Sequence, residues 1–145
     1  MYRDAQTLYL TTLERNPGAW MAHNNLGLLR LNSGQIEEAK ARFEQTLALK
    51  PDYAEAHNNL AVALGELGQI PQAIEHYQQA IRLKPDYAEA WMNLATKYAK
   101  TGRPAEALAA AQKALESARA KGRTTMVRNI ENWLGAHTSL PREPR

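Results

Sequence analysis

Apolar and polar positions along the chain follow a helical pattern that recurs every 34 residues. The segment Lys50–Ala56 recurs residue for residue at 84–90. Within each period, large side chains fall at helical spacing, as Trp91, Leu94 and Tyr98 do, which places them on one face of a helix. The pattern therefore predicts three successive pairs of amphipathic helices.

Glycine and proline residues mark the limits of these helices. Gly34, Gly68 and Gly102 lie 34 residues apart, where a left-handed residue would end the first helix of each pair. Pro71 and Pro104 fall where the second helix begins, a position at which a missing N–H is tolerated. The turns between the two helices of a pair are therefore predicted to be short.

Two further patterns concern helix packing and helix starts. Small residues recur at fixed positions, where they allow two helices to approach closely. They are Gly27, Ala61 and Ala95 on the first helices and Ala39, Ala73 and Ala107 on the second helices. Asp52 with Glu55, and Asp86 with Glu89, have the spacing of a capping box and predict the start of the next first helix.

This register resembles the tetratricopeptide repeat (TPR) family, whose repeat carries Trp, Leu, Gly and Tyr, then Ala and Phe, then Pro at fixed spacing. The third repeat supplies Trp91, Leu94, Ala95, Tyr98 and Ala107. The resemblance implies an all-α fold, an α-solenoid of antiparallel helix pairs. The predicted repeats are 20–53, 54–87 and 88–121.

The two ends of the chain depart from a complete repeat. Ala5, Tyr9 and Pro17 match the second half of a repeat, so residues 1–17 are predicted to be a half repeat with its second helix only. This start indicates a piece of a longer protein. Because repeats cannot bury their apolar faces alone, we expect self-association through this half repeat.

The C-terminal end is predicted to carry a capping helix at 122–137, followed by a tail at 138–145. Met126, Ile130 and Trp133 share one helical face with polar residues opposite, so we expect Trp133 to be largely buried. With the half repeat and three helix pairs, the cap brings the expected number of helices to eight.

Composition and charge exclude several classes of site. The chain of 145 residues has no cysteine, which excludes disulfides and zinc–thiolate sites. From Arg119 onward there are six basic and two acidic residues, so the net charge of +3 comes from the C-terminal end. The remainder lacks the basic stripe that nucleic acids require. The absence of a signal peptide and of a long apolar stretch predicts a soluble segment that does not itself insert into a membrane.

Candidate catalytic chemistry is absent from the sequence. No serine lies in a glycine-flanked elbow and no phosphate-binding glycine loop occurs, so we expect no enzyme activity and no cofactor. His23 and His57 occupy the position of Trp91, where they could be metal ligands or rings that fill the place of the tryptophan. Helices about 8–10 Å apart do not bring such rings within the ~2 Å of a zinc ligand, which favours packing and no metal.

Asparagine recurs directly before the signature leucine, at Asn25, Asn59 and Asn93. Asparagine is a poor helix former, and its amide matches the donor and acceptor of a peptide unit. The array is similar to the TPR arms of O-linked N-acetylglucosamine transferases, in which an asparagine ladder holds bound polypeptide. The resemblance places these residues in a concave groove. The alternative is that each amide bonds to neighbouring helices and only fixes their arrangement.

A carboxylate clamp, as in the heat-shock co-chaperones of this family, is not supported. The basic positions of that clamp are held here by Asn24, Glu89 and Asn93, and one of its asparagine positions by Leu28. Only Asn59 fits.

The sequence therefore favours a scaffold that binds extended polypeptide segments, a protein or peptide partner, in the concave groove. The predicted groove residues are Met21, Asn24, Asn25, Leu28, Asn58, Asn59, Val62, Met92, Asn93 and Thr96. Two alternatives stay open. One is a non-catalytic, substrate-presenting arm of a larger, membrane-anchored glycosyltransferase, which the C-terminal layout resembles. The other is a homo-oligomeric assembly scaffold.

Overall fold

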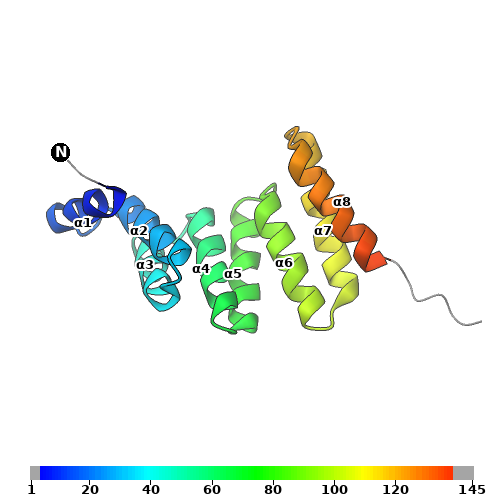
Figure 1. Cartoon of the computed structure of the whole chain (residues 1–145), viewed down its shortest axis with the longest axis horizontal. Coiled ribbons are helices and arrows are strands. Elements are labelled where there is room, and N and C mark those ends of the chain that lie inside the picture. Colours follow the sequence, from blue (N-terminus) through cyan, green and yellow to red (C-terminus); the bar gives the residue numbers. More distant parts are fainter. Residues whose placement is uncertain (1–3, 139–145) are drawn as a thin grey trace, which may run out of the picture. The chain divides into compact units, whose positions relative to one another are not determined.

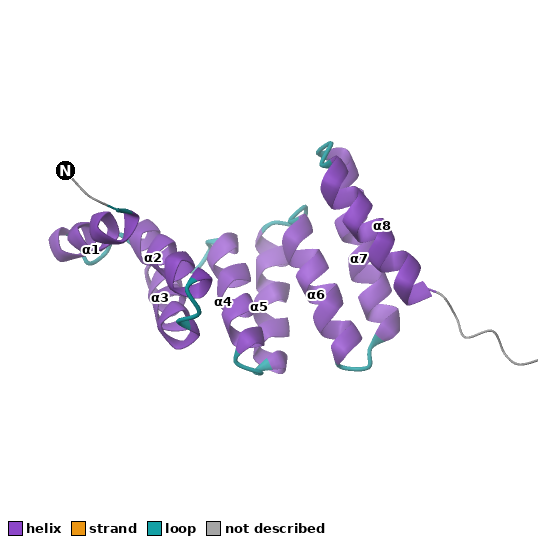
Figure 2. Cartoon of the chain, in the orientation of Figure 1, coloured by secondary structure: helices purple, strands orange, loops and turns teal. Residues whose placement is uncertain are grey.

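The computed structural model describes residues 4–138, and all regular secondary structure within them is α-helical (Figures 1 and 2). The helices are α1 (Ala5–Arg15), α2 (Trp20–Asn32), α3 (Ile36–Leu49), α4 (Ala54–Glu66), α5 (Ile70–Leu83), α6 (Ala88–Lys100), α7 (Pro104–Ala120) and α8 (Thr124–Thr138). The predicted all-α class and the eight helices expected are confirmed over this range. The predicted tail at 138–145 lies, apart from its first residue, outside the described residues.

The chain divides into two compact units, residues 1–83 and 84–145. In the first unit α2 packs against α3 and α4 against α5, while α3 contacts α4 and α1 contacts α2. In the second unit α7 packs against both α6 and α8. Each first helix is thus followed by a second helix that packs directly against it.

The close approach of α2 and α3 depends on Gly27. A Cβ atom built on Gly27 would lie 2.6 Å from Cε1 of Phe43, and Phe43 is completely buried. Ala39 on α3 and Ala61 on α4 are also fully buried at the small positions of the pattern. Small side chains on one helix therefore make room for the large side chain of its neighbour.

The turns within the helix pairs follow the predicted glycine pattern. Gly34, Gly68 and Gly102 have φ values of 79°, 77° and 72°, in the left-handed region that favours glycine. The residue after each glycine donates its N–H to a carbonyl five residues earlier, as Gln35 N does to Arg30 O at 2.8 Å. Gly122, with φ of 66°, repeats this turn before α8.

The predicted capping boxes are wrong. The residues that precede α4 and α6 are Tyr53 and Tyr87, and neither makes a side-chain capping bond. Asp52 stands one residue too early and pairs with Lys50 at 3.2 Å. Asp86 pairs with Lys121 at 3.0 Å instead. Tyr53 packs edge-on against Trp20 with ring centroids 4.7 Å apart, and Tyr87 is buried.

The α1 helix covers part of the apolar face of α2. Leu13 is buried together with Ala22 and Leu26, and Tyr9 packs against this cluster. Leu8 stays exposed. Asp4 caps the helix by accepting a hydrogen bond from Thr7 N at 2.7 Å, and this bond lowers the pKa of the Asp4 carboxyl. Self-association through this end stays a prediction.

The C-terminal helix α8 buries Ile130 and Leu134, as expected for a cap. The prediction that Trp133 is largely buried is wrong, because its ring is only half-buried. The ring instead stacks on His137, with centroids 3.8 Å apart and planes at 16°. His137 Nδ1 also lies 2.8 Å from Trp133 O, which fixes the imidazole on the indole.

His23, His57 and Trp91 occupy the same position in the three repeats and make the same kind of hydrogen bond. A ring nitrogen of each lies within hydrogen-bond distance of a proline carbonyl six residues earlier. The pairs are His23 with Pro17 at 2.9 Å, His57 with Pro51 at 3.0 Å and Trp91 with Pro85 at 2.8 Å. The shared bond supports the packing role of His23 and His57. Among residues 4–138 no three His, Asp or Glu side chains converge to hold a metal ion.

His76 on α5 forms a hydrogen-bonded pair with His57 on α4, and the contacts of His57 determine which nitrogen of the pair is the donor. His57 Nε2 must carry a proton to donate to Pro51 O, so its Nδ1 accepts. His76 Nδ1, 3.1 Å away, is then the donor in the neutral pair. Burial, followed by the influence of His57, lowers the pKa of His76, against the opposite effect of Glu75 and Glu44.

We predict that replacing Gly27 with alanine destabilises the chain, whereas replacing Gly135 does not. The new methyl group at Gly27 would overlap the buried Phe43 ring, a type of overpacking that costs about 1–3 kcal/mol. Gly135 is also helical, but nothing lies within 4 Å of its Cβ position. Gly135→Ala should stabilise by about 0.5–1 kcal/mol through helix propensity. Denaturant unfolding measures the free energy of unfolding of the two variants. Equal changes in this free energy would contradict the close contact between Gly27 and Phe43.

We further predict that acidification destabilises the chain through His76. Its pKa is lowered in the folded state, so between that value and the unfolded value near 6.5 the unfolded chain binds more protons. The stabilising contribution is therefore complete above about pH 6.5 and declines as the pH falls below it. In urea unfolding between about pH 8 and 5, His76→Gln should lose less stability than the wild type. If the free energy of unfolding changes equally with pH in the wild type and in His76→Gln, the histidine pair has no such effect.

Candidate functional site

Half-exposed side chains form one face of the first helices in the first unit. Met21, Asn25 and Leu28 stand at i, i+4 and i+7 on α2, and Met21 is 58% exposed. Asn59 and Val62 on α4 are likewise half-exposed. α2 and α4 contact each other, and we call these side chains of the two helices the first-helix face.

Two of the predicted groove residues lie below this face. Asn24 is 4% exposed and Asn58 is 7% exposed. Asn59 Nδ2 donates to Asn24 Oδ1 at 3.1 Å and so joins α4 to α2. For Asn24 and Asn59, this bond supports the alternative that the amides bond to neighbouring helices and fix their arrangement. The bond engages one hydrogen of the Asn59 amide, which has a second N–H and an acceptor oxygen for further contacts.

In the second unit, α6 carries the remaining predicted residues. Met92, Asn93 and Thr96 are all half-exposed on this helix. Thr96 Oγ1 donates to Asn93 O at 2.7 Å, so its hydroxyl hydrogen is engaged within the helix. Met92 has a different surrounding, because it faces α8 across a pocket.

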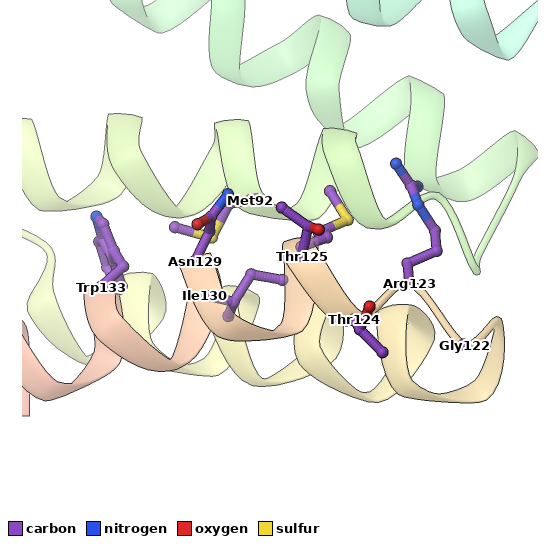
Figure 3. A pocket seen from close by; sticks show the side chains of 9 residues that line it. Met92, Gly122, Arg123, Thr124, Thr125, Asn129, Ile130 and Trp133 are labelled. Atoms are coloured by element: carbon purple, nitrogen blue, oxygen red, sulfur yellow. The ribbon is translucent and has the colours of Figure 1, made fainter.

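This pocket lies between α6 and α8 and has a volume of about 770 Å³ (Figure 3). A cavity of this size falls within the range of ligand-binding pockets in proteins. Its lining residues are Met92, Gly122, Arg123, Thr124, Thr125, Met126, Asn129, Ile130 and Trp133. All of them belong to the second unit.

The sequence does not predict this pocket, because the apolar pattern of α8 indicates only a capping helix. The pattern predicts a largely buried Trp133, whereas the structure leaves both Trp133 and Met126 half-exposed along the pocket. One signal was present. Asn129 directly precedes the buried Ile130, just as Asn93 directly precedes the buried Leu94. The two asparagines are 36 residues apart, so Asn129 does not fall in the 34-residue register of the repeats.

The charged groups near the pocket are paired. Arg123 Nη1 lies 2.5 Å from Glu89 Oε1, and Lys121 Nζ lies 3.0 Å from Asp86 Oδ2. Burial opposes ionisation of Glu89, but a backbone hydrogen bond and the Arg123 guanidinium outweigh it and lower the pKa of this carboxyl. Both carboxylates therefore stay ionised at neutral pH and keep their basic partners.

No helix within residues 4–138 is both long and apolar enough to cross a membrane.

Solved structures with a similar fold come from several proteins. MamA matches with a TM-score of 0.73 and 20% identity, over 94% of this chain and 94% of that one. The TPR2B domain of yeast Sti1, in a structure titled as its complex with pHsp70, matches with a TM-score of 0.78 and 20% identity, over 82% and 95%. The type III secretion translocator chaperone SycD of Yersinia enterocolitica gives 0.76 and 20%, over 88% and 83%. Identities this low show the fold alone.

Family-level sequence patterns cover most of the chain, although no curated protein sequence matches it. A pattern described as TPR repeat matches residues 27–68 and 64–102. Two patterns described as tetratricopeptide repeat match residues 8–41 and 88–120. With the helix pairs and the solved structures of the same fold, these matches establish that the chain belongs to the tetratricopeptide repeat family.

Proposed function

We propose that the chain binds extended polypeptide segments through the exposed asparagines of its first helices. One observation carries the proposal. Asn25, Asn59 and Asn93 each directly precede a buried leucine, yet each is itself half-exposed. A half-exposed asparagine within a helix costs several tenths of a kcal/mol relative to alanine. A recurrent cost of this kind at a surface position fits a ligand contact.

The chemistry of the amide suits a polypeptide main chain. A side-chain amide can donate to a carbonyl and accept from an N–H, and every peptide unit offers both groups. In the first unit, α2 and α4 are in contact, and packed helices lie about 8–10 Å apart. An extended chain advances about 3.3 Å per residue. Asn25 and Asn59 would then meet a bound segment at about every third residue, whatever its side chains.

The titles of two similar structures support the general class of this proposal, protein binding. The solved structure of the yeast Sti1 domain is titled as a complex with pHsp70, and SycD is titled a translocator chaperone. For the present chain we propose the same general class, a protein-binding scaffold and not an enzyme. A substrate-presenting arm of a glycosyltransferase is a special case of this function. A homo-oligomeric scaffold would instead use other surfaces, such as the exposed Leu8 of α1.

We predict that replacing Asn25, Asn59 and Asn93 together with alanine weakens peptide binding by at least about tenfold. Each neutral hydrogen bond contributes about 0.5–1.5 kcal/mol net, and 1.4 kcal/mol corresponds to a factor of ten in the dissociation constant. The probes are fluorescein-labelled nonapeptides selected on the wild-type chain from a random-sequence display library. Fluorescence anisotropy should show a similar loss for peptides of different sequence, because the contact is to the main chain.

The matched control replaces three exposed amides on the second helices, Gln45, Gln72 and Gln112, with alanine. These changes should leave binding unchanged. Circular dichroism must show that both triple variants stay folded, since Asn59 also bonds to Asn24. If the asparagine variant unfolds, the ladder is structural, and if it stays folded and binds as the wild type does, these asparagines do not contact the ligand. If it binds normally but the wild type self-associates through α1, the oligomeric scaffold is favoured.

A further inference from the structure

Helix α8 reproduces the surface pattern of a first helix. Asn129 precedes Ile130, which is 1% exposed, and the buried Leu134 follows four residues later. In the same way Asn93 precedes Leu94, also 1% exposed, and the buried Tyr98 follows four residues later. The step is 36 residues because α7 is three residues longer than α3 and α5, while the link at 121–123 is one residue shorter than the link at 84–87. Asn129 is thus a fourth asparagine of the series, and it is exposed.

The pocket beside Asn129 has apolar walls, and no helix among residues 84–138 fills it. Met92, Met126, Ile130 and Trp133 line it, and Figure 3 shows Met92 with Ile130 and Trp133. The stack on His137 holds the half-exposed Trp133 in place. Methionine side chains are flexible and polarisable, so Met92 and Met126 can adjust around apolar groups of different shape. The pocket therefore suits an apolar side chain from another molecule.

The charges around the pocket indicate a neutral occupant. Arg123 lines one end of the pocket and pairs with Glu89, and nearby Lys121 pairs with Asp86. A carboxylate entering the pocket would compete with Glu89 for Arg123, and an ammonium group would meet Arg123. Either charged group would also lose its hydration on contact with Met92, Met126 and Trp133, which costs free energy. An uncharged apolar group has neither cost.

We propose that the α6–α8 pocket is an anchoring subsite for one uncharged apolar side chain, such as that of phenylalanine, leucine or methionine, in an extended segment of a partner polypeptide. Asn129, at the edge of the pocket, hydrogen-bonds the main chain of the anchored residue. The proposal rests on the proposed function, because it extends the asparagine series to α8. It adds a side-chain preference to a contact that is otherwise independent of sequence.

The test uses the full chain and single-residue probes, so that no partner need be known. The probes are the N-acetyl amides of phenylalanine, leucine and methionine, with those of glutamate and lysine for comparison. Methyl NMR spectra of the methionines report where they bind. The apolar probes should shift the Met92 and Met126 methyl signals with dissociation constants on the order of millimolar, as fragments of this size do. Met21, exposed on α2, is the internal control and should not shift.

Variants then assign the subsite to its residues. Trp133→Ala should weaken phenylalanine amide binding about three- to tenfold, the range for loss of an aromatic contact. Met126→Glu should weaken it without removing the indole, in case Trp133→Ala alters the packing of α8. Asn129→Ala should weaken all three apolar probes alike. The control Leu49→Ala removes an exposed apolar side chain of α3 and should change nothing.

The outcomes separate this proposal from the proposed function. Equal shifts from charged and apolar probes, shifts of Met21 equal to those of Met92, or no saturable shift would overturn the anchoring subsite. None of these results depends on the asparagines of α2 and α4. Conversely, loss of nonapeptide binding in the Asn25, Asn59 and Asn93 variant tests the ladder and leaves single-residue binding at Trp133 unchanged.

Discussion

The contact between the Phe43 ring and the backbone of Gly27 shows the constraint on which the helix pairs depend. Two helices approach closely only if one offers almost no side chain where the other inserts a large one. Small and large buried side chains recur one repeat later, where Ala61 and Ala73 are fully buried and Tyr77 is 1% exposed. Burial raises the pKa of Tyr77 far above that of a free tyrosine, so its hydroxyl stays neutral. Close packing within each pair fixes which face of the first helix remains outside.

The parts of the fold that follow from local chemistry could be predicted from the sequence. Gly34, Gly68 and Gly102 end their helices because only glycine readily adopts the positive φ of that turn. The helix starts could not be predicted in the same way. Asp52 and Asp86 have capping spacing, but their side chains pair with Lys50 and Lys121. Which of two available partners an aspartate takes depends on tertiary neighbours, and these are not visible in a local motif.

The candidate site was predicted only in part, for a related reason. Helical periodicity shows which residues share a face, but it does not separate a half-exposed Asn25 from the adjacent buried Asn24. The α6–α8 pocket depends on the length of α7, which carries α8 out of the 34-residue register. The apolar face of α8 predicts a buried Trp133, because a tryptophan on such a face is usually a core residue. Its half-exposed position follows from the stack on His137 and the open space beside Met92.

The bond between Asn59 and Asn24 does not exclude a ligand contact by Asn59, because one amide has several hydrogen-bonding groups. Asn59 joins α4 to α2 with a single N–H, and that bond also restricts the rotation of its amide. An amide held in one orientation loses less entropy when it binds a second partner. The same holds for α8, where Ile130 closes the core of the second unit and thereby sets the direction of Asn129. A helix that caps the array can therefore also present a binding surface, because burial of one face orients the other.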